Sequence, residues 1–178
     1  IDKGKENIFC NFLIENNFSK SYESRIVNSI YYDTLDLNFF NDNLDGISNR
    51  IKYRFRWYNN KNLSLFLEEK KRNNFIGKKN KLFISNFNNQ DELFKFLKNY
   101  SFKYNEKYEP LFPILKISYF RSYWLSQCKK YRATIDTEIN VECIKGFNSN
   151  KFPLEINFNV LEFKYPIKID KNFRNEHF

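Results

Sequence analysis

The sequence has few of the residues on which most nucleotide-binding loops and catalytic sites depend. Its 178 residues include 4 glycines, 1 histidine and no methionine. The glycines are too few and too scattered for a phosphate-binding or dinucleotide-binding loop, which needs several within a short stretch. The single histidine, His177, is the penultimate residue. Its isolation excludes a Ser-His-Asp triad and a histidine-based zinc site.

Cysteines and long apolar runs are also scarce. The three cysteines, Cys10, Cys128 and Cys143, are odd in number and far apart. This pattern is typical of reduced thiols, so we expect a cytoplasmic protein, free or at the cytosolic face of a membrane. No apolar run approaches the roughly 20 residues of a membrane-spanning helix, and no signal peptide is recognisable. Because the chain starts at Ile1 and lacks methionine, we expect a fragment.

Basic and aromatic residues are abundant. Lys and Arg number 30 against 21 Asp and Glu, a net charge of +9, and aromatics make up 20% of the chain. Several enriched residues, Lys among them, have AT-rich codons, so nucleotide bias explains part of this charge. The placement of arginine is harder to explain in that way. The length suits one domain with a substantial core, which buries roughly 70% of the unfolded surface.

Residue patterns predict an α+β fold, a largely antiparallel sheet with flanking helices. Helical spacing of apolar residues predicts helices over 5–17 and 90–100, the second capped by Asn89 or Asp91, and a helical turn within 35–44. β-branched and aromatic runs predict about seven strands. Seven are expected at 25–34, 47–58, 63–72, 81–84, 114–124, 131–138 and 154–165, and 139–144 is a further candidate.

Segment 50–57 alternates cations with apolar residues. Side chains of a strand point alternately to its two faces. One face therefore carries Arg50, Lys52, Arg54 and Arg56, and the other carries Ile51, Tyr53, Phe55 and Trp57. An ordinary sheet with its apolar face on a core and its cations in water explains this strand by itself.

The same charged pattern recurs in other strands. Charged or polar side chains that share a face are Glu68, Lys70 and Arg72; Tyr119 and Arg121; Arg132, Thr134 and Asp136, with Ala133 and Ile135 opposite; and Glu162 and Lys164. An antiparallel sheet with such faces turned inward would form a barrel enclosing a charged tunnel. Inward like charges are costly unless a polyanion and a bound metal complete the site.

The residue types indicate which ligands such a tunnel would hold. Arg and Lys bind phosphate oxygens, Arg in bidentate fashion. Glu68 and Glu162 offer the carboxylate oxygens that Mg²⁺ or Mn²⁺ prefers when it bridges phosphates. Glu69 competes with Glu68 for the inward position. Either of the two predicted ligands could instead be a structural partner of a neighbouring arginine.

Short motifs along the chain are similar to those of a known family. They are VNSIYYDT at 27–34, NLDG at 43–46, RIKYRFRWY at 50–58, EEK at 68–70, YFR at 119–121, RATID at 132–136 and LEFKY at 161–165. In this order they resemble the VTC domain, the polyphosphate polymerase branch of the CYTH-like triphosphate tunnel metalloenzymes. The resemblance implies a single domain over residues 1–178, built as a mainly antiparallel β-barrel with flanking helices.

The resemblance also implies an activity, the transfer of the γ-phosphate of ATP to a growing polyphosphate chain with Mn²⁺ or Mg²⁺. Since the acceptor is itself an ionised phosphate, positioning and charge neutralisation can carry the reaction without His, Ser or Cys. Implied catalytic residues are Arg54, Arg56, Lys70, Arg121 and Arg132. Further phosphate contacts are Arg50, Lys52, Arg72 and Lys164, and the metal ligands are Glu162 and Glu68. The partners are ATP and inorganic polyphosphate, without nucleic acid, and any membrane-bound partner domain lies outside this chain.

Two departures from the family pattern concern the chain ends. No strand with Glu-x-Lys precedes the helix at 5–17, and 173–178 stops before the family's basic Ser-Lys-Tyr-like motif. We therefore expect truncation at both ends and an inactive fragment that still binds triphosphate weakly.

Three alternative functions stay open. They are triphosphate hydrolysis in the same tunnel, non-catalytic binding of polyphosphate or inositol phosphates, and nucleic-acid binding. The last is disfavoured because the aromatics of 50–57 lie opposite the cations, whereas single-strand binders interleave them on one face.

Overall fold

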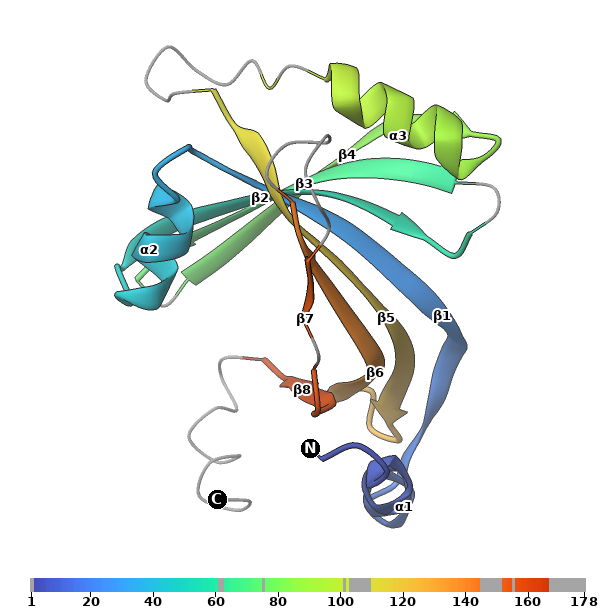
Figure 1. Cartoon of the computed structure of the whole chain (residues 1–178). Helices are drawn as coiled ribbons and strands as arrows, with labels where there is room; N and C mark the ends of the chain where they lie inside the picture. Colours follow the sequence, from blue (N-terminus) through green and yellow to red (C-terminus); the bar gives the residue numbers. More distant parts are fainter. Residues whose placement is uncertain are drawn as a thin grey trace. The chain divides into compact units, whose positions relative to one another are not determined.

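A computed structural model describes residues 2–60, 63–74, 76–100, 102, 110–144, 152–154 and 156–166 (Figure 1). In these ranges it has three helices and eight strands. The helices are α1 Glu6–Glu15, α2 Asn38–Leu44 and α3 Gln90–Asn99. The strands are β1 Phe18–Asp33, β2 Asn49–Tyr58, β3 Leu63–Asn73, β4 Ile76–Phe87, β5 Phe112–Ser126, β6 Arg132–Cys143, β7 Phe152–Leu154 and β8 Val160–Lys164.

The strands form one mainly antiparallel sheet, which confirms the α+β prediction. Their order is β4-β3-β2-β1-β5-β6-β7, and β8 pairs with β6. Among the described strands this path has two ends, so the closed barrel is not observed and stays a prediction. Contacts divide the chain into two compact units, described separately below. Unit 1 comprises Ile1–Arg25, Tyr119–Ile139 and Ile156–Phe178, and unit 2 comprises Ile26–Ser118 and Asn140–Glu155.

The core of unit 2 lies on the apolar face of β2, as the alternation at 50–57 predicts. Its buried β2 side chains are Ile51, Tyr53, Phe55 and Trp57, none more than 9% exposed. Leu93 and Leu97 of α3 join the same cluster, and α3 packs against β4 (Figure 1). Asn89 caps α3 as expected, because its side chain accepts a hydrogen bond of 2.9 Å from the backbone N–H of Glu92.

Unit 1 has a smaller core of its own. Leu13 of α1 and Trp124 of β5 are buried with Ala133 and Ile135 of β6. The helix predicted at 5–17 is therefore confirmed as α1, and Ala133 and Ile135 lie on an apolar face that packs against it, as expected for the side opposite the charged residues. The described residues include no helix long and apolar enough to cross a bilayer.

Several strand boundaries differ from the sequence prediction, and β1 begins at Phe18 rather than at 25. β4 begins at Ile76 rather than at 81, because the Lys- and Asn-rich stretch 77–80 pairs with 69–72 of β3 in spite of its low strand propensity. The strands expected at 131–138 and 139–144 are one strand, β6, in which Glu138 has a positive φ of 52°. The strand expected at 154–165 is divided into β7 and β8.

A buried carboxylate at the end of β1 holds the start of α2. Asp33 is 2% exposed, and its Oδ1 accepts hydrogen bonds from the backbone N–H groups of Thr34 at 2.8 Å and Phe39 at 2.9 Å. Its Oδ2 accepts a third, at 2.8 Å, from Phe40. The N-cap residue itself, Leu37, has a left-handed φ of 57° and no side-chain oxygen. Asp33 therefore takes the part that a polar N-cap usually has.

We expect Asp33→Ala to lower the free energy of unfolding by about 2 kcal/mol, because three backbone donors lose their acceptor. Urea unfolding monitored by circular dichroism measures this difference. The matched control is Asp36→Ala, an exposed carboxylate four residues earlier than Phe40, which should change stability by less than about 0.5 kcal/mol. Equal stability of the two variants would show that α2 does not depend on Asp33.

Candidate phosphate-binding site

Antiparallel pairing gathers most of the predicted cations on one face of unit 2. Residues directly opposite each other in such a pair point to the same side of the sheet. The pairs are Arg50↔Arg72, Lys52↔Lys70 and Arg54↔Glu68 between β2 and β3, and Lys70↔Lys79 and Glu68↔Lys81 between β3 and β4. The resulting cationic face consists of Arg50, Lys52, Arg54, Arg56, Lys70, Arg72, Lys79 and Lys81, with Glu68 among them.

One end of this face is hollowed. The hollow has a volume of about 340 Å³ and is lined by Asn43, Arg50, Lys52, Lys70, Arg72 and Gly77. We call it the basic hollow. Four of its six residues are cations and none is a carboxylate. Asn43 comes from α2, so the cap at Asp33 also positions one wall of the hollow. Its size falls in the range of small-ligand sites.

The four cations of the basic hollow lack acidic partners in the part of unit 2 that the structure describes. None has a carboxylate within ion-pair distance there. Arg50 donates a hydrogen bond of 2.9 Å to the backbone carbonyl of Ile47, and Arg72 donates one of 2.9 Å to that of Asn74. These bonds fix the two guanidinium groups. Their remaining N–H donors are available for an anion.

Burial and neighbouring cations both disfavour the charged form of Lys52. Burial lowers the pKa of Lys52, and the neighbouring Lys70, Arg50 and Arg54 lower it further, against an opposite influence from Tyr31. A cation whose charged form is disfavoured in this way gains when an anion approaches. The hollow is therefore organised to receive negative charge.

Next to the basic hollow, a buried carboxylate binds three cations. Glu68 is 2% exposed, and its Oε2 lies 2.7 Å from Nη2 of Arg54 and 3.8 Å from Nη1 of Arg56. Its Oε1 forms an ion pair at 2.7 Å with Nζ of Lys79. Burial raises the pKa of Glu68, but Lys79, Arg54 and Arg56 outweigh it and hold the pKa below its usual value. We call this group the Glu68 hub.

Arg54 and Arg56 are fixed by further contacts on β1. Arg54 donates a hydrogen bond of 2.7 Å to the hydroxyl of Tyr31, and Arg56 donates one of 3.1 Å to Oγ of Ser29. Burial alone would lower the pKa of Arg54, but Tyr31 and Glu68 raise it above its usual value. Both arginines therefore have structural partners. Their predicted contact with phosphate stays a prediction.

The register resolves the choice between Glu68 and Glu69. Glu69 lies on the opposite face, where its carboxylate accepts a hydrogen bond of 2.8 Å from Tyr53 and pairs with Lys71 at 3.2 Å. Glu68 does share the cationic face, as expected. Its surroundings do not suit a metal ion, however, because three cations already surround its two oxygens. The sequence interpretation that kept a structural role open for this residue fits better.

Glu162 has surroundings that suit a metal ion better. Its side chain is 43% exposed, and it forms an ion pair at 3.2 Å with Lys164, itself about half exposed. It lies opposite Thr134 in the β6–β8 pair, and Lys164 lies opposite Arg132. Mg²⁺ commonly needs only one or two protein carboxylates when phosphates supply the other ligands. The described residues contain no group of three or more His, Cys, Asp or Glu side chains able to hold a metal by themselves.

Arg121, predicted as a phosphate contact, already has a bidentate partner within unit 1. Its Nε lies 2.5 Å from Oδ1 of Asp136, and its Nη2 lies 2.6 Å from Oδ2. Burial would lower the pKa of Arg121, but these bonds and the neighbouring Tyr119 raise it. The arginine is thereby oriented and its charge is balanced. Sequence patterns placed Asp136 on a polar face but did not reveal this pair.

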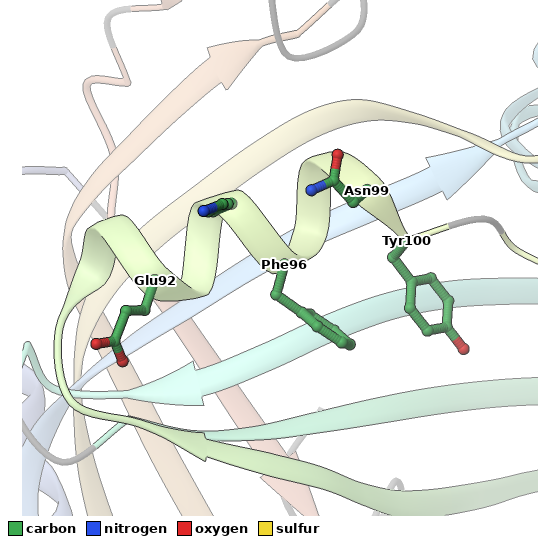
Figure 2. Close-up of a pocket in the computed structure, with 5 residues that line it drawn as sticks. Glu92, Phe96, Asn99 and Tyr100 are labelled. Carbon is green, nitrogen blue, oxygen red and sulfur yellow. The ribbon is translucent and has the colours of Figure 1, made fainter.

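A second hollow, of about 420 Å³, runs along α3 and differs in chemistry (Figure 2). Its lining residues are Glu92, Lys95, Phe96, Asn99 and Tyr100. Phe96 and Tyr100 point to the same side of the helix. The ring centroid of Phe96 lies 5.3 Å from that of Phe87, and the ring centroid of Tyr100 lies 4.9 Å from that of Phe55 in the core. One cation beside one carboxylate offers little to a polyanion. The basic hollow, though smaller, is therefore the better candidate site.

Four residues of the site were not among those predicted, namely Asn43, Gly77, Lys79 and Lys81. Lys79 belongs to a run of polar residues that resembles a turn more than a strand, and Lys81 is the first residue of the strand predicted at 81–84, so the sequence assigned neither lysine to the cationic face. Only their pairing with Lys70 and Glu68 does so.

Comparison with known proteins shows the family of the chain. No curated protein matches the sequence. The family model described as the VTC domain matches residues 5–175, nearly the whole chain. That match includes every strand of the cationic face and the predicted residues of unit 1. The chain belongs to the VTC domain family.

Proposed function

We propose that this chain is the catalytic domain of an ATP-dependent polyphosphate polymerase that uses Mn²⁺ or Mg²⁺. Membership of the VTC domain family indicates a polyphosphate-related function. The observation that carries the finer proposal is the basic hollow, in which four cations face one volume without a carboxylate among the lining residues. The closed antiparallel barrel expected for the family is part of this proposal.

In the proposed reaction, the four cations of the basic hollow bind phosphate oxygens and neutralise part of the phosphate charge. They are Arg50, Lys52, Lys70 and Arg72. An attraction between unit charges 4 Å apart is about 4 kcal/mol near a protein surface, against about 1 kcal/mol in water. The attacking group is a terminal phosphate that is already ionised, so no protein base has to remove a proton. Positioning and charge neutralisation then account for the transfer.

The other predicted residues have supporting roles in this proposal. Arg54 and Arg56, held by the Glu68 hub, add positive charge to the cationic face beside the basic hollow. Within unit 1, the residues proposed to contact phosphate are Arg121, Arg132 and Lys164. Glu162 would hold the metal, which when bound neutralises phosphate charge.

Incubation of the full-length protein with ATP and Mn²⁺ tests the proposal. We expect long phosphate chains on a gel together with one ADP for each phosphate added. ADP with free phosphate and no chains would identify a hydrolase instead. Binding of polyphosphate without ADP formation would identify a non-catalytic binding domain. The double variant Lys52→Ala/Lys70→Ala is expected to make no chains.

A further inference from the structure

The cationic face also carries aromatic side chains at the end away from the basic hollow. Phe66 lies opposite Arg56 in the β2–β3 pair and opposite Phe83 in the β3–β4 pair. Tyr58 follows Arg56 by two residues, so it points to the same face. The rings of Phe66 and Phe83 are 5.7 Å apart at 63°. We call Tyr58, Phe66 and Phe83 the aromatic platform.

A lysine lies over this platform. Nζ of Lys81 is 3.6 Å from the ring centroid of Phe66 and 5.8 Å from that of Tyr58. This cation–π contact shows that the ring face of Phe66 is turned toward the cationic side of the sheet, where a base could take the place of the ammonium group. Lys81 is itself exposed and flexible enough to move aside.

Core packing does not explain the platform. The hydrophobic core of unit 2 lies on the other face, where Phe55 and Leu65 are fully buried. Phe83 is 52% exposed. The β3–β4 register also shifts between Leu65 and Phe66, and such irregularities commonly redirect side chains beside functional sites. Here the shift places Phe83 beside Phe66.

The spacing suits a ligand with one ring and several phosphates. Phe66 precedes Lys70 by four residues on β3, a distance of about 14 Å at the usual rise per residue. This is roughly the length of an extended nucleoside triphosphate. The intervening carboxylate, Glu68, is held by Arg54 and Lys79 and so presents little free negative charge.

We propose that the aromatic platform binds the base of a nucleoside triphosphate whose phosphates lie in the basic hollow. This inference rests on the proposed function, since it assigns the base of the same substrate. It also changes one expectation from the sequence, which placed the aromatics of 50–57 on the face opposite the cations. The side chains of the aromatic platform lie on the cationic face instead. Stacking on aromatic side chains contributes about 5- to 150-fold in affinity for each base and accepts every base, because every base has a π-face. We therefore expect weak discrimination between ATP and GTP.

Calorimetry on the unsubstituted full chain tests the inference. It compares ATP with ribose 5-triphosphate, which carries the same phosphates but no base. We expect ATP to bind at least 5-fold more tightly. Equal affinities would overturn the inference while leaving the proposed phosphate site intact. Absence of binding by both compounds would overturn the proposed function and the inference together.

Two variants place the effect on the platform. Phe66→Ser/Phe83→Ser should remove the advantage of ATP and leave the affinity for ribose 5-triphosphate within about 2-fold. Leu82→Ser is the matched control, because Leu82 is 60% exposed on the same strand but points to the opposite face. An unchanged ATP advantage in the double variant would contradict the inference. So would tighter binding of an oligothymidylate than of ATP, which would indicate a single-stranded nucleic acid as the ligand.

Discussion

Glu68→Ala is expected to lower the free energy of unfolding by about 3 to 5 kcal/mol, the largest effect that we predict for any single substitution. The carboxylate is 2% exposed and is the counter-charge of Arg54, Arg56 and Lys79. Arg56 is itself only 6% exposed, so it would remain buried with an uncompensated charge. Chemical unfolding near pH 7 measures the difference.

The pH dependence of stability provides a second test of the Glu68 hub. The folded-state pKa of Glu68 lies below its usual value of 4.5. Its stabilising contribution is therefore complete above that unfolded-state value and is lost as the pH falls through the lower folded-state pKa. Glu68→Gln should flatten the stability profile in this acidic window.

Glu162→Ala is the control for both measurements. Its partner Lys164 and Glu162 itself are about half exposed, and exposed pairs contribute only about 0 to 1 kcal/mol. Similar losses for Glu68→Ala and Glu162→Ala would show that the Glu68 hub is no stronger than a surface pair.

The hub also affects any test of Arg54 or Arg56 by alanine substitution. A loss of turnover there has to be read beside a melting curve, since each change leaves Glu68 with fewer partners.

Lys52→Ala/Lys70→Ala should weaken tripolyphosphate binding by at least about 100-fold at low salt, because each removed contact involves charges on both partners. Stability should not fall, since Lys52 is repelled by Lys70 and the neighbouring arginines. Isothermal titration at two salt concentrations measures both the loss of affinity and the extent to which salt screens the interaction.

A double variant on the other face of the sheet, in β3 and β4, is the matched control. Lys71 and Lys78 are paired directly opposite each other, one residue along from Lys70 and Lys79. Lys71→Ala/Lys78→Ala removes the same net charge, so a general electrostatic attraction would weaken equally in both double variants. We expect the control to stay within about 3-fold of the unmodified protein at moderate salt. Equal losses would mean that binding reflects net charge rather than the basic hollow.

The sequence predicted the parts of the fold that depend on local patterns. The alternation at 50–57 placed Phe55 and Trp57 in the core and Arg54 on the other face, and the structure agrees. Asn89 as the cap of α3 was likewise predictable, because capping depends on nearby residues. The early start of β4 was not, because its lysines and asparagines form a strand only through pairing with β3.

The candidate site was predictable in composition but not in its internal contacts. The alternation of side chains between the two faces of a strand identified Arg50, Lys52 and Lys70. It could not show that Glu68 is buried beneath three cations. Nor could it show the bidentate pair between Arg121 and Asp136. Both depend on the register between strands, which no single segment of sequence contains.

Lysine labelling with and without tripolyphosphate tests most directly whether the basic hollow is the phosphate site. Acetylation of the native protein, followed by mass spectrometry, reports each lysine separately, and Lys71 and Lys78 serve as internal controls on the opposite face. We predict that tripolyphosphate slows labelling of Lys52 and Lys70 and leaves Lys71 and Lys78 unchanged. Equal protection on both faces, or protection of Lys71 and Lys78 alone, would contradict the account.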